Sequence, residues 1–266
     1  MRSEFDLTGR TAIVTGGGGI LGTGFCQVLA GHGARVAVFD VDQASAQKTV
    51  DLIKQDAIAI ACDVSNAKSV ADSVAQVVSA FGTIDILHNN AATKTANLAD
   101  FFAAFEDYHI DTWREVMGVN IDGMFLMAQA VGKQMLAQGH GGSIIQTASI
   151  YGVVAPDQRI YEGSQYLGRP INTPAVYASS KAAVIGLTRY LAAYWGAQGI
   201  RVNTLTPGGV ESGQNDVFSR KYSARVPLGR MARVDEMQSA LLFLASDASS
   251  YVTGQNLVID GGLTCW

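Results

Sequence analysis

The chain has 266 residues, and its apolar fraction of 48% is enough to bury a substantial core in one large domain or two small ones. Its formal net charge is -4 and it has no long run of lysine and arginine, so the composition gives no electrostatic reason to expect binding to nucleic acid or to anionic membranes. Three widely separated cysteines argue against a disulfide framework and a zinc site, and the polar N-terminus, without a signal peptide or a membrane-spanning stretch, makes the cytosol the expected location.

Short runs rich in β-branched residues alternate with longer stretches of helical periodicity along the chain. Near-continuous apolar strands of this kind are buried on both faces, and their alternation with helices predicts an α/β fold, a doubly wound parallel sheet with helices on both faces. No linker or shift in composition divides the chain, so residues 1–266 are expected to form a single domain. Strands are expected at residues 10–15, 35–40, 57–63, 84–89, 142–147, 200–205 and 256–259, and helices at 20–31, 42–55, 65–81, 111–138, 175–198 and 235–245.

Two segments do not fit this alternation. Residues 93–108 follow the fourth expected strand, and residues 150–173 form a long, polar, aromatic-bearing loop after the fifth. Both leave the carboxyl ends of strands, where open α/β sheets bind ligands, and long loops in compact domains tend to be functional. We therefore expect a substrate loop at about residues 150–173.

A glycine-rich segment joins the first expected strand to the first expected helix. Glycine permits positive φ and close approach of the backbone to a pyrophosphate, and a helix N-terminus favours the phosphate charge. A tight turn without a ligand would use the same residue type, but the place between a strand and a helix is the one that the dinucleotide motif requires. The segment therefore predicts a Rossmann-type cofactor site that includes Gly16, Gly19, Ile20, Leu21 and Gly22.

Asp40 stands at the end of the second expected strand and is followed by Val41. A carboxylate at this place accepts hydrogen bonds from the ribose hydroxyls of NAD, whereas the 2′-phosphate of NADP meets a like charge. The glycine segment has no arginine or lysine to offset that repulsion. An N-cap or a turn at the strand end is the ordinary alternative role for such an aspartate. We expect NAD as the cofactor, with Asp40 and Val41 at its adenosine ribose.

Tyr177 and Lys181 are four residues apart in the helix expected at 175–198, so they share one helix face. A phenol titrates at about 10, and a neighbouring ammonium favours the phenolate and lowers that pKa. The pair could therefore act as an acid and base at working pH. A tyrosine and a lysine at this spacing are also common on protein surfaces, so the pair alone does not identify a catalytic site.

Together with further motifs in a fixed order, this pair makes the chain resemble the short-chain dehydrogenase/reductase family over nearly its whole length. The motifs are the Thr15–Gly22 segment, Asp63-Val64, Asn89-Asn90-Ala91, Asn120, Ser149, Tyr177 with Lys181, Pro207-Gly208 and Asp260-Gly261-Gly262.

The resemblance implies roles for individual positions. Tyr177 would exchange the hydroxyl proton, Lys181 would lower the tyrosine pKa and hold the nicotinamide ribose, and Ser149 would bond the substrate oxygen. Asn120 would mark a helix break and hold a water that relays protons to Lys181. The remaining cofactor contacts would be Asp63 and Val64 at adenine, Asn90 and Ala91 at ribose, and Pro207, Gly208 and Val210 at the nicotinamide side. The hydride chemistry itself belongs to the cofactor.

The chain departs from the family pattern at three places. Ile20 and Ala92 stand where glycine is usual, and Ser149 is separated from Tyr177 by roughly twice the usual spacing. Ser143 and Ser164 are alternative positions for the substrate-binding serine, although neither directly follows the fifth strand.

The residues inserted between Ser149 and Tyr177 are rich in hydrogen-bonding groups and poor in apolar surface, which favours a sugar, a polyol or an anionic sugar derivative over a steroid or an acyl chain. Lys94, Arg159 and Arg169 could hold a carboxylate or phosphate. The candidate substrate residues are Ser149, Tyr151, Lys94, Arg159 and Arg169. The loop could instead pack on residues 93–108 or on a neighbouring subunit.

Two other functions stay open: an NADP-dependent ketoacyl or carbonyl reductase, against which Asp40 argues, and an inactive NAD-binding regulatory protein, against which the intact set of catalytic motifs argues. The family resemblance also implies a homotetramer, and the apolar end of the chain at Trp266 is a candidate for a subunit contact.

Overall fold

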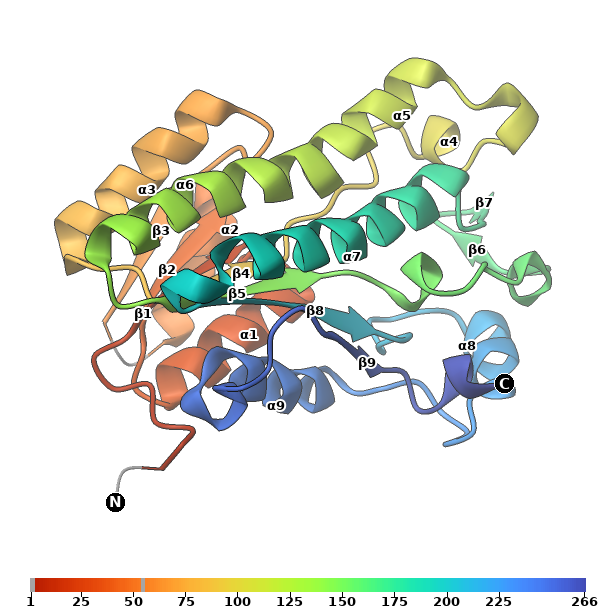
Figure 1. Cartoon of the computed structure of the whole chain (residues 1–266). Coiled ribbons are helices and arrows are strands. Elements are labelled where there is room, and N and C mark those ends of the chain that lie inside the picture. The colour runs from red at the N-terminus through yellow and green to blue at the C-terminus, as the bar shows by residue number, and fades with distance from the viewer. Residues whose placement is uncertain (1–2, 54–55) are drawn as a thin grey trace.

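The fold is built on one main sheet of seven parallel strands in the order β3-β2-β1-β4-β5-β8-β9 (Figure 1). The computed structural model describes residues 3–53 and 56–266. The order reverses between β1 and β4, which creates the crevice where doubly wound sheets bind ligands. The doubly wound α/β class predicted from the sequence is confirmed. The strands are β1 Thr11–Thr15, β2 Arg35–Asp40, β3 Ala57–Ala61, β4 Ile86–Asn89, β5 Gly142–Thr147, β8 Ile200–Pro207 and β9 Asn256–Ile259.

Helices cover both faces of the sheet, because alternate strand residues point to opposite sides. In β1, Ile13 packs into one core with α3, α6 and α7, whereas Ala12 and Val14 pack into the other with α1, α2 and α9. Figure 1 shows these two helix layers above and below the strands. The helices named in these two layers are α1 Ile20–Gly31, α2 Gln43–Leu52, α3 Ala67–Phe81, α6 Gly123–Gln138, α7 Ala175–Trp195 and α9 Val234–Ala245.

Most predicted elements lie within a few residues of the observed ones, and the differences have local causes. The strand predicted at 57–63 ends at Ala61, because Asp63 forms a turn in which its carboxylate accepts from the backbone of Ser65. Asn66 then caps α3, which begins at Ala67. The end of the helix predicted at 42–55 lies outside the described residues, and α2 itself ends at Leu52.

The helix predicted at 111–138 is one helical run with a change of winding inside it. The α5 helix, Ile110–Met117, continues through a π-helical turn, Gly118–Asp122, into α6. Single π turns inside α-helices are often found at functional sites. The predicted helix at 175–198 likewise ends in a 3-10 turn, Gly196–Gln198, after α7.

The two irregular segments and the region after β8 contain short elements that the sequence did not predict. Residues 93–108 contain α4 Leu98–Phe101 and a 3-10 turn, Phe105–Asp107. The predicted substrate loop contains 3-10 turns at Ile150–Gly152 and Gln158–Tyr161 and an antiparallel hairpin of β6 Gln165–Tyr166 and β7 Arg169–Pro170. The remaining elements are α8 Asp216–Ser223 and 3-10 turns at Asp247–Ser249 and Leu263–Cys265.

The predicted substrate loop packs on two other segments at the carboxyl edge of the sheet. The Asn172 amide donates to the Phe102 carbonyl at 2.9 Å, and the Asn215 amide donates to the Ser164 hydroxyl at 2.7 Å. The loop thus makes the packing on residues 93–108 that was the alternative to a substrate role. Figure 1 shows the hairpin next to α4 at this end of the molecule.

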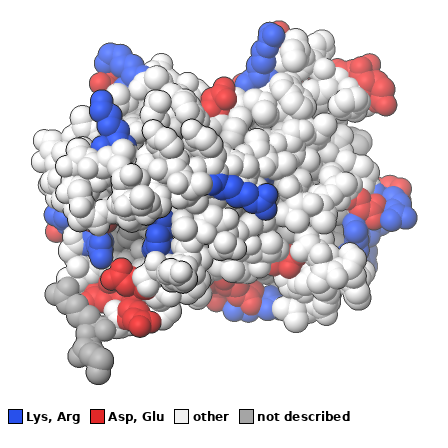
Figure 2. Space-filling model, in the orientation of Figure 1, with Lys and Arg blue, Asp and Glu red and all other residues white. Residues whose placement is uncertain are grey.

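The surface carries scattered charges. On the face shown in Figure 2, acidic and basic side chains are interspersed over a mainly uncharged surface. None of the helices formed by residues 3–53 and 56–266 is both long enough and apolar enough to cross a membrane.

Candidate active site

A cleft of about 830 Å³ opens at the carboxyl ends of the central strands. Its wall brings together all the residues predicted to bind the cofactor, although they come from six separate segments of the chain. They are Gly16, Gly19, Ile20, Leu21, Gly22, Asp40, Val41, Asp63, Val64, Asn90, Ala91, Tyr177, Lys181, Pro207, Gly208 and Val210.

The glycine turn forms a cradle that side chains would fill. Gly16 has a φ of 62°, and a Cβ on it would lie 3.0 Å from the Ala91 Cα. A Cβ on Gly22 would lie 2.0 Å from the Gly16 carbonyl oxygen, so the helix can pack this closely only with glycine there. Gly19 is the N-cap of α1 and presents no side chain, which leaves the backbone N–H groups of the first turn open to the cleft. This cradle fits a pyrophosphate, and Ile20 in place of glycine does not close it.

The two ends of the cleft differ in charge. Among the described residues that line it, the acidic ones are Asp40 and Asp63 and the basic ones are Lys94 and Lys181. The Asp40 carboxylate accepts from the backbone N–H of Gly18 at 3.0 Å and of Asp42 at 3.1 Å, which fixes its orientation at the end of β2. Each oxygen keeps a further lone pair for a ligand hydroxyl.

Tyr177 lies at the other end of the cleft, on the first turn of α7, and shares the cleft wall with Ser149, which interacts with its phenol. Burial raises the pKa of the Tyr177 phenol above its usual value, and the interaction with Ser149 lowers it by less. The predicted lowering of this pKa is therefore wrong for the chain by itself, because desolvation of the phenolate outweighs the favourable contacts.

Lys181 is buried on the same helix face as Tyr177. Its Nζ donates to the Thr147 carbonyl at 2.9 Å and lies 5.8 Å from the centroid of the Tyr177 ring. Burial lowers the pKa of Lys181 to about 8. The Lys181 side chain is therefore mainly charged at neutral pH. It lines the cleft beside the ring of Tyr177.

Asn120 lies inside the π turn and is fully buried behind the cleft, not in its wall. Its Oδ1 accepts from the Thr93 backbone at 3.0 Å, and its Nδ2 donates to the Ser180 hydroxyl at 3.2 Å. In place of the predicted helix break, the helix continues through a π turn at this position. Asn120 thus links the segment after β4 to α7, where its partner Ser180 directly precedes Lys181.

The predicted substrate residues separate into two groups. Ser149 and Lys94 line the cleft, and the Lys94 ammonium lies 5.0 Å from the ring centroid of Tyr166 in the hairpin. Tyr151 lies outside the cleft wall, with its hydroxyl 3.4 Å from that of Tyr161.

The structure does not bring Arg159 and Arg169 into the cleft. Arg159 is exposed, and its guanidinium donates twice to Asp157 at 2.8 Å, so this predicted anion ligand is already paired at the surface. Arg169 is exposed on the hairpin.

The two alternative serines lie elsewhere. Ser143 is buried at the start of β5 and donates to the Leu244 carbonyl, and Ser164 is buried against Asn215. Neither lines the cleft, which leaves Ser149 as the serine beside Tyr177 despite the long insertion.

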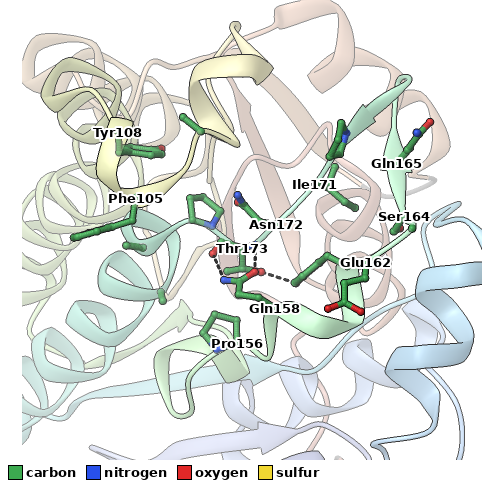
Figure 3. Close-up of a pocket in the computed structure, with 17 residues that line it drawn as sticks. Phe105, Tyr108, Pro156, Gln158, Glu162, Ser164, Gln165, Ile171, Asn172 and Thr173 are labelled. Carbon is green, nitrogen blue, oxygen red and sulfur yellow. Dashed lines mark hydrogen bonds between the residues drawn. The ribbon is translucent and has the colours of Figure 1, made fainter.

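Some features of the site were missed by sequence reasoning. Thr147 lines the cleft and supplies the carbonyl that holds Lys181, and a backbone acceptor leaves no sequence signal. Ser212 and Cys62 also line the cleft. A second cavity, of about 760 Å³, lies beneath the hairpin beside the start of α7 (Figure 3).

The comparisons with known proteins agree with this geometry. A family model described as enoyl-(acyl carrier protein) reductase matches residues 19–264. D-threitol dehydrogenase from Mycolicibacterium smegmatis is 37% identical over 269 residues, which cover 98% of this chain and 95% of the relative. A solved gluconate 5-dehydrogenase from Burkholderia cenocepacia in complex with NADP and tartrate gives a TM-score of 0.85 at 34% identity and covers 99% of this chain and 98% of its own. A short-chain dehydrogenase from Leptospira borgpetersenii with bound NAD+ gives a TM-score of 0.85 at 33% identity, with 99% and 96% covered.

Proposed function

Because this chain belongs to the short-chain dehydrogenase/reductase family, we propose that it is an NAD-dependent dehydrogenase that interconverts a secondary alcohol and a ketone on a sugar, a polyol or an anionic sugar derivative. One observation carries the proposal. Ser149, Tyr177 and Lys181 meet at one end of a single cleft, and Asp40 stands in its wall at the end of β2.

The proposed roles follow from the position of each group. NAD, when bound, would supply the nicotinamide ring that accepts a hydride from the carbinol carbon. Tyr177 takes the carbinol proton in oxidation and returns it in reduction, and Ser149, next to it, donates a hydrogen bond to the substrate oxygen. Lys181, held by the Thr147 carbonyl, places a positive charge near the tyrosine that favours the phenolate. Asn120 keeps the segment after β4 against α7.

The preference for NAD over NADP is proposed from charge. Solved relatives hold either cofactor, so the choice rests on this chain's own residues. Asp40 lies in the cleft wall with Val41, whose side chain is 76% exposed, and among the described lining residues both basic ones belong to other segments, after β4 and on α7. A 2′-phosphate near Asp40 would meet a fixed negative charge with no compensating cation.

The substrate class is proposed from the wall near Tyr177 and from the relatives. Ser149, Thr93 and Ser212 present hydroxyls there, and Lys94 is the one predicted anion ligand that stays in the cleft among the described residues. A polyol could form hydrogen bonds with these hydroxyls, and the carboxylate of a sugar acid could also pair with Lys94. D-threitol and gluconate, which name two relatives, are examples of these two classes.

We also propose that residues 1–266 form one catalytic domain that assembles as a homotetramer. Tyr190 and Tyr194 stack on each other on the outer side of α7 and are 64% and 62% exposed, and Phe125 is exposed on α6. Large exposed apolar side chains on neighbouring helices mark a surface for protein contact. Trp266, the last residue of the sequence, is 82% exposed.

The test is the initial rate of reduced-cofactor formation from a panel of polyols, sugars, sugar acids and apolar alcohols, with NAD and with NADP. We expect turnover of a polyol or sugar acid, with NAD preferred at least about tenfold, which corresponds to about 1.4 kcal/mol. Turnover only with NADP supports the carbonyl reductase instead. NADH binding without turnover of any compound supports the regulatory protein.

A further inference from the structure

The second cavity is enclosed by three segments of the chain and shares no lining residue with the cleft. Figure 3 shows Phe105 and Tyr108 on one side and Ser164 and Gln165 of the hairpin segment on the other, with the first turn of α7 closing the wall between them. Its volume of about 760 Å³ lies in the range of small-molecule sites.

The lining of this cavity suits an uncharged ligand that carries hydroxyl groups. Glu162 is the one charged residue among the described residues that line it, and it faces Lys221 at 3.6 Å. Apolar surface comes from Phe105, Ile171 and three prolines. Such a mixture of an aromatic face and neutral polar groups matches a sugar or polyol, which has C–H faces and a rim of hydroxyls.

Two polar atoms in the wall lack partners. The Tyr108 hydroxyl and the Asn172 Oδ1 are buried with no hydrogen-bond partner among the described residues, although the Asn172 amide N–H donates to Phe102. Buried polar groups are normally paired. Burial raises the pKa of Tyr108 to about 12, so its hydroxyl stays protonated and neutral. Small rotations of these two side chains would offer a donor and acceptors to ligand hydroxyls.

A pair of hydroxyls separates the cavity from the catalytic tyrosine. Tyr161 lines the cavity, its hydroxyl lies 2.5 Å from that of Thr173, and it is close enough to Tyr177 to influence the phenol electrostatically. Ala178, which follows Tyr177 on α7, also lines the cavity. Tyr161 and Thr173 both line the cavity, so their hydroxyls can bond a polyhydroxy ligand there.

The hairpin lines the cavity and contacts one residue of the cleft wall. Gln165 lines the cavity, whereas the next residue, Tyr166, stacks on Lys94 at the rim of the cleft. Residues that enclose the cavity thus continue directly into those that border the reaction site.

We propose that the second cavity is the distal part of the substrate site and binds an uncharged, hydroxyl-bearing unit of the substrate remote from the reacting carbinol. This inference rests on the proposed function. It predicts that the enzyme prefers a polyol that carries a further sugar unit over a four-carbon polyol, because only the longer compound reaches past Tyr161.

The test is to fill the cavity without touching the cleft. Ala175 is exposed at the first position of α7 and lines the cavity, so Ala175→Phe narrows it, and Ala71→Phe on the exposed side of α3 is the matched control. We expect the wild type and Ala71→Phe to have a kcat/KM at least about tenfold higher for a sugar-bearing polyol such as maltitol than for threitol. Ala175→Phe should lose that preference and keep its kcat/KM for threitol.

Equal kcat/KM for the two polyols in the wild type, or an equal loss for both in Ala175→Phe, would overturn the inference while leaving the dehydrogenase function intact. A crystal soaked with maltitol decides the question even if neither compound is turned over. Density beneath the hairpin supports the distal site, and density only beside Tyr177, or none, contradicts it.

Discussion

Burial acts in opposite directions on the two titratable residues of the proposed catalytic pair. It raises the pKa of the Tyr177 phenol and lowers that of the Lys181 ammonium to about 8, because both charged forms lose water. The phenol is therefore ready to donate a proton at neutral pH, whereas it becomes a base only as the pH rises.

This difference predicts opposite pH profiles for the two directions of the reaction. Oxidation needs the phenolate, so its kcat/KM should rise with pH above neutrality. Reduction needs the phenol, so its kcat/KM should stay level at low pH and fall as the tyrosine loses its proton. Rates measured in both directions over the same buffers check this. An oxidation rate that is already at its maximum below neutral pH would contradict the role of a tyrosine whose pKa is raised.

His88 is a second buried titratable group next to the site. It lies in β4 with no exposed surface, its Nε2 is 2.8 Å from the Thr147 hydroxyl, and its ring packs edge-on against Phe25. Burial lowers the pKa of His88 to about 3. The unfolded chain binds a proton at this residue below its usual value of 6.5, and the native chain does not until about pH 3.

The sign of this difference predicts a loss of stability in acid. The contribution of neutral His88 to the free energy of unfolding is fully present above about pH 6.5 and is lost as the pH falls toward 3. By pH 4 the loss amounts to about 3 kcal/mol. In His88→Leu, the decrease in unfolding free energy between neutral pH and about pH 4 should be smaller by roughly that amount. Urea unfolding at both pH values measures it. His32→Leu, at an exposed histidine, should keep the wild-type decrease, and an unchanged decrease in His88→Leu would refute the prediction.

At the scale of elements, the hairpin has a strained turn, and the residue before that turn contacts the cleft wall. Tyr166 and Arg169 pair across a turn whose two central residues, Leu167 and Gly168, have φ values of 50° and 75°. Positive φ at both positions is the pattern of a type I′ turn, which favours Asn-Gly and disfavours leucine at the first position. Thr95, next to Lys94, has a φ of 65°. The contact between Lys94 and Tyr166 therefore lies between two residues held in a conformation that is costly for them.

Leu167→Asn should stabilise the hairpin by up to about 1 kcal/mol, because asparagine tolerates the left-handed conformation. Leu167 is 75% exposed, so little packing is lost. We expect slower hydrogen exchange of the backbone amides of residues 165–170 and little change in the global unfolding temperature. Leu52→Asn, at an exposed leucine with no positive φ, should not slow exchange in the hairpin. Faster exchange in Leu167→Asn would contradict the strained turn.

The regular elements were predictable because their signals are local. Apolar strand patterns and helix periodicity lie within one segment, and the residues predicted to bind the cofactor follow the ends of those strands, where the fold gathers them. The π turn has no comparable signal, because Gly118–Asp122 continues the helical pattern on both sides. The hairpin was missed because leucine hides its turn type, and α8 is short and mainly polar.

The residues predicted to bind the cofactor do line one cleft, but three of the predicted substrate residues and the electrostatics of the site were not predictable from the sequence. The lowered tyrosine pKa was expected from the spacing of Tyr177 and Lys181, but spacing does not report desolvation. Arg159 was expected at the substrate because of its charge, but in the structure its guanidinium pairs with Asp157, a contact that depends on the local backbone conformation. Contacts that depend on tertiary packing, such as the Thr147 carbonyl on Lys181, need the structure.

For the whole molecule, the proposed tetramer makes a prediction about the outer face of α7. Tyr194→Asp places a charge beside the exposed ring of Tyr190, so the assembly should weaken by at least about tenfold in its dissociation constant. Sedimentation of the wild type and the variant measures it. Tyr251→Asp, at a fully exposed loop tyrosine, should leave the assembly unchanged. A wild type that sediments as a monomer would contradict the proposed assembly.

At the scale of the whole molecule, Tyr177 is the one tyrosine among the described residues that line the cleft, so its removal tests the proposed chemistry most directly. The measurement is the rate of NADH formation by Tyr177→Phe, beside Tyr190→Phe on the exposed side of the same helix, with the dissociation constant for NADH measured on both. We predict a loss of about a thousandfold or more in kcat for Tyr177→Phe, with NADH binding nearly unchanged and Tyr190→Phe fully active. Wild-type turnover by Tyr177→Phe would contradict the proposed chemistry.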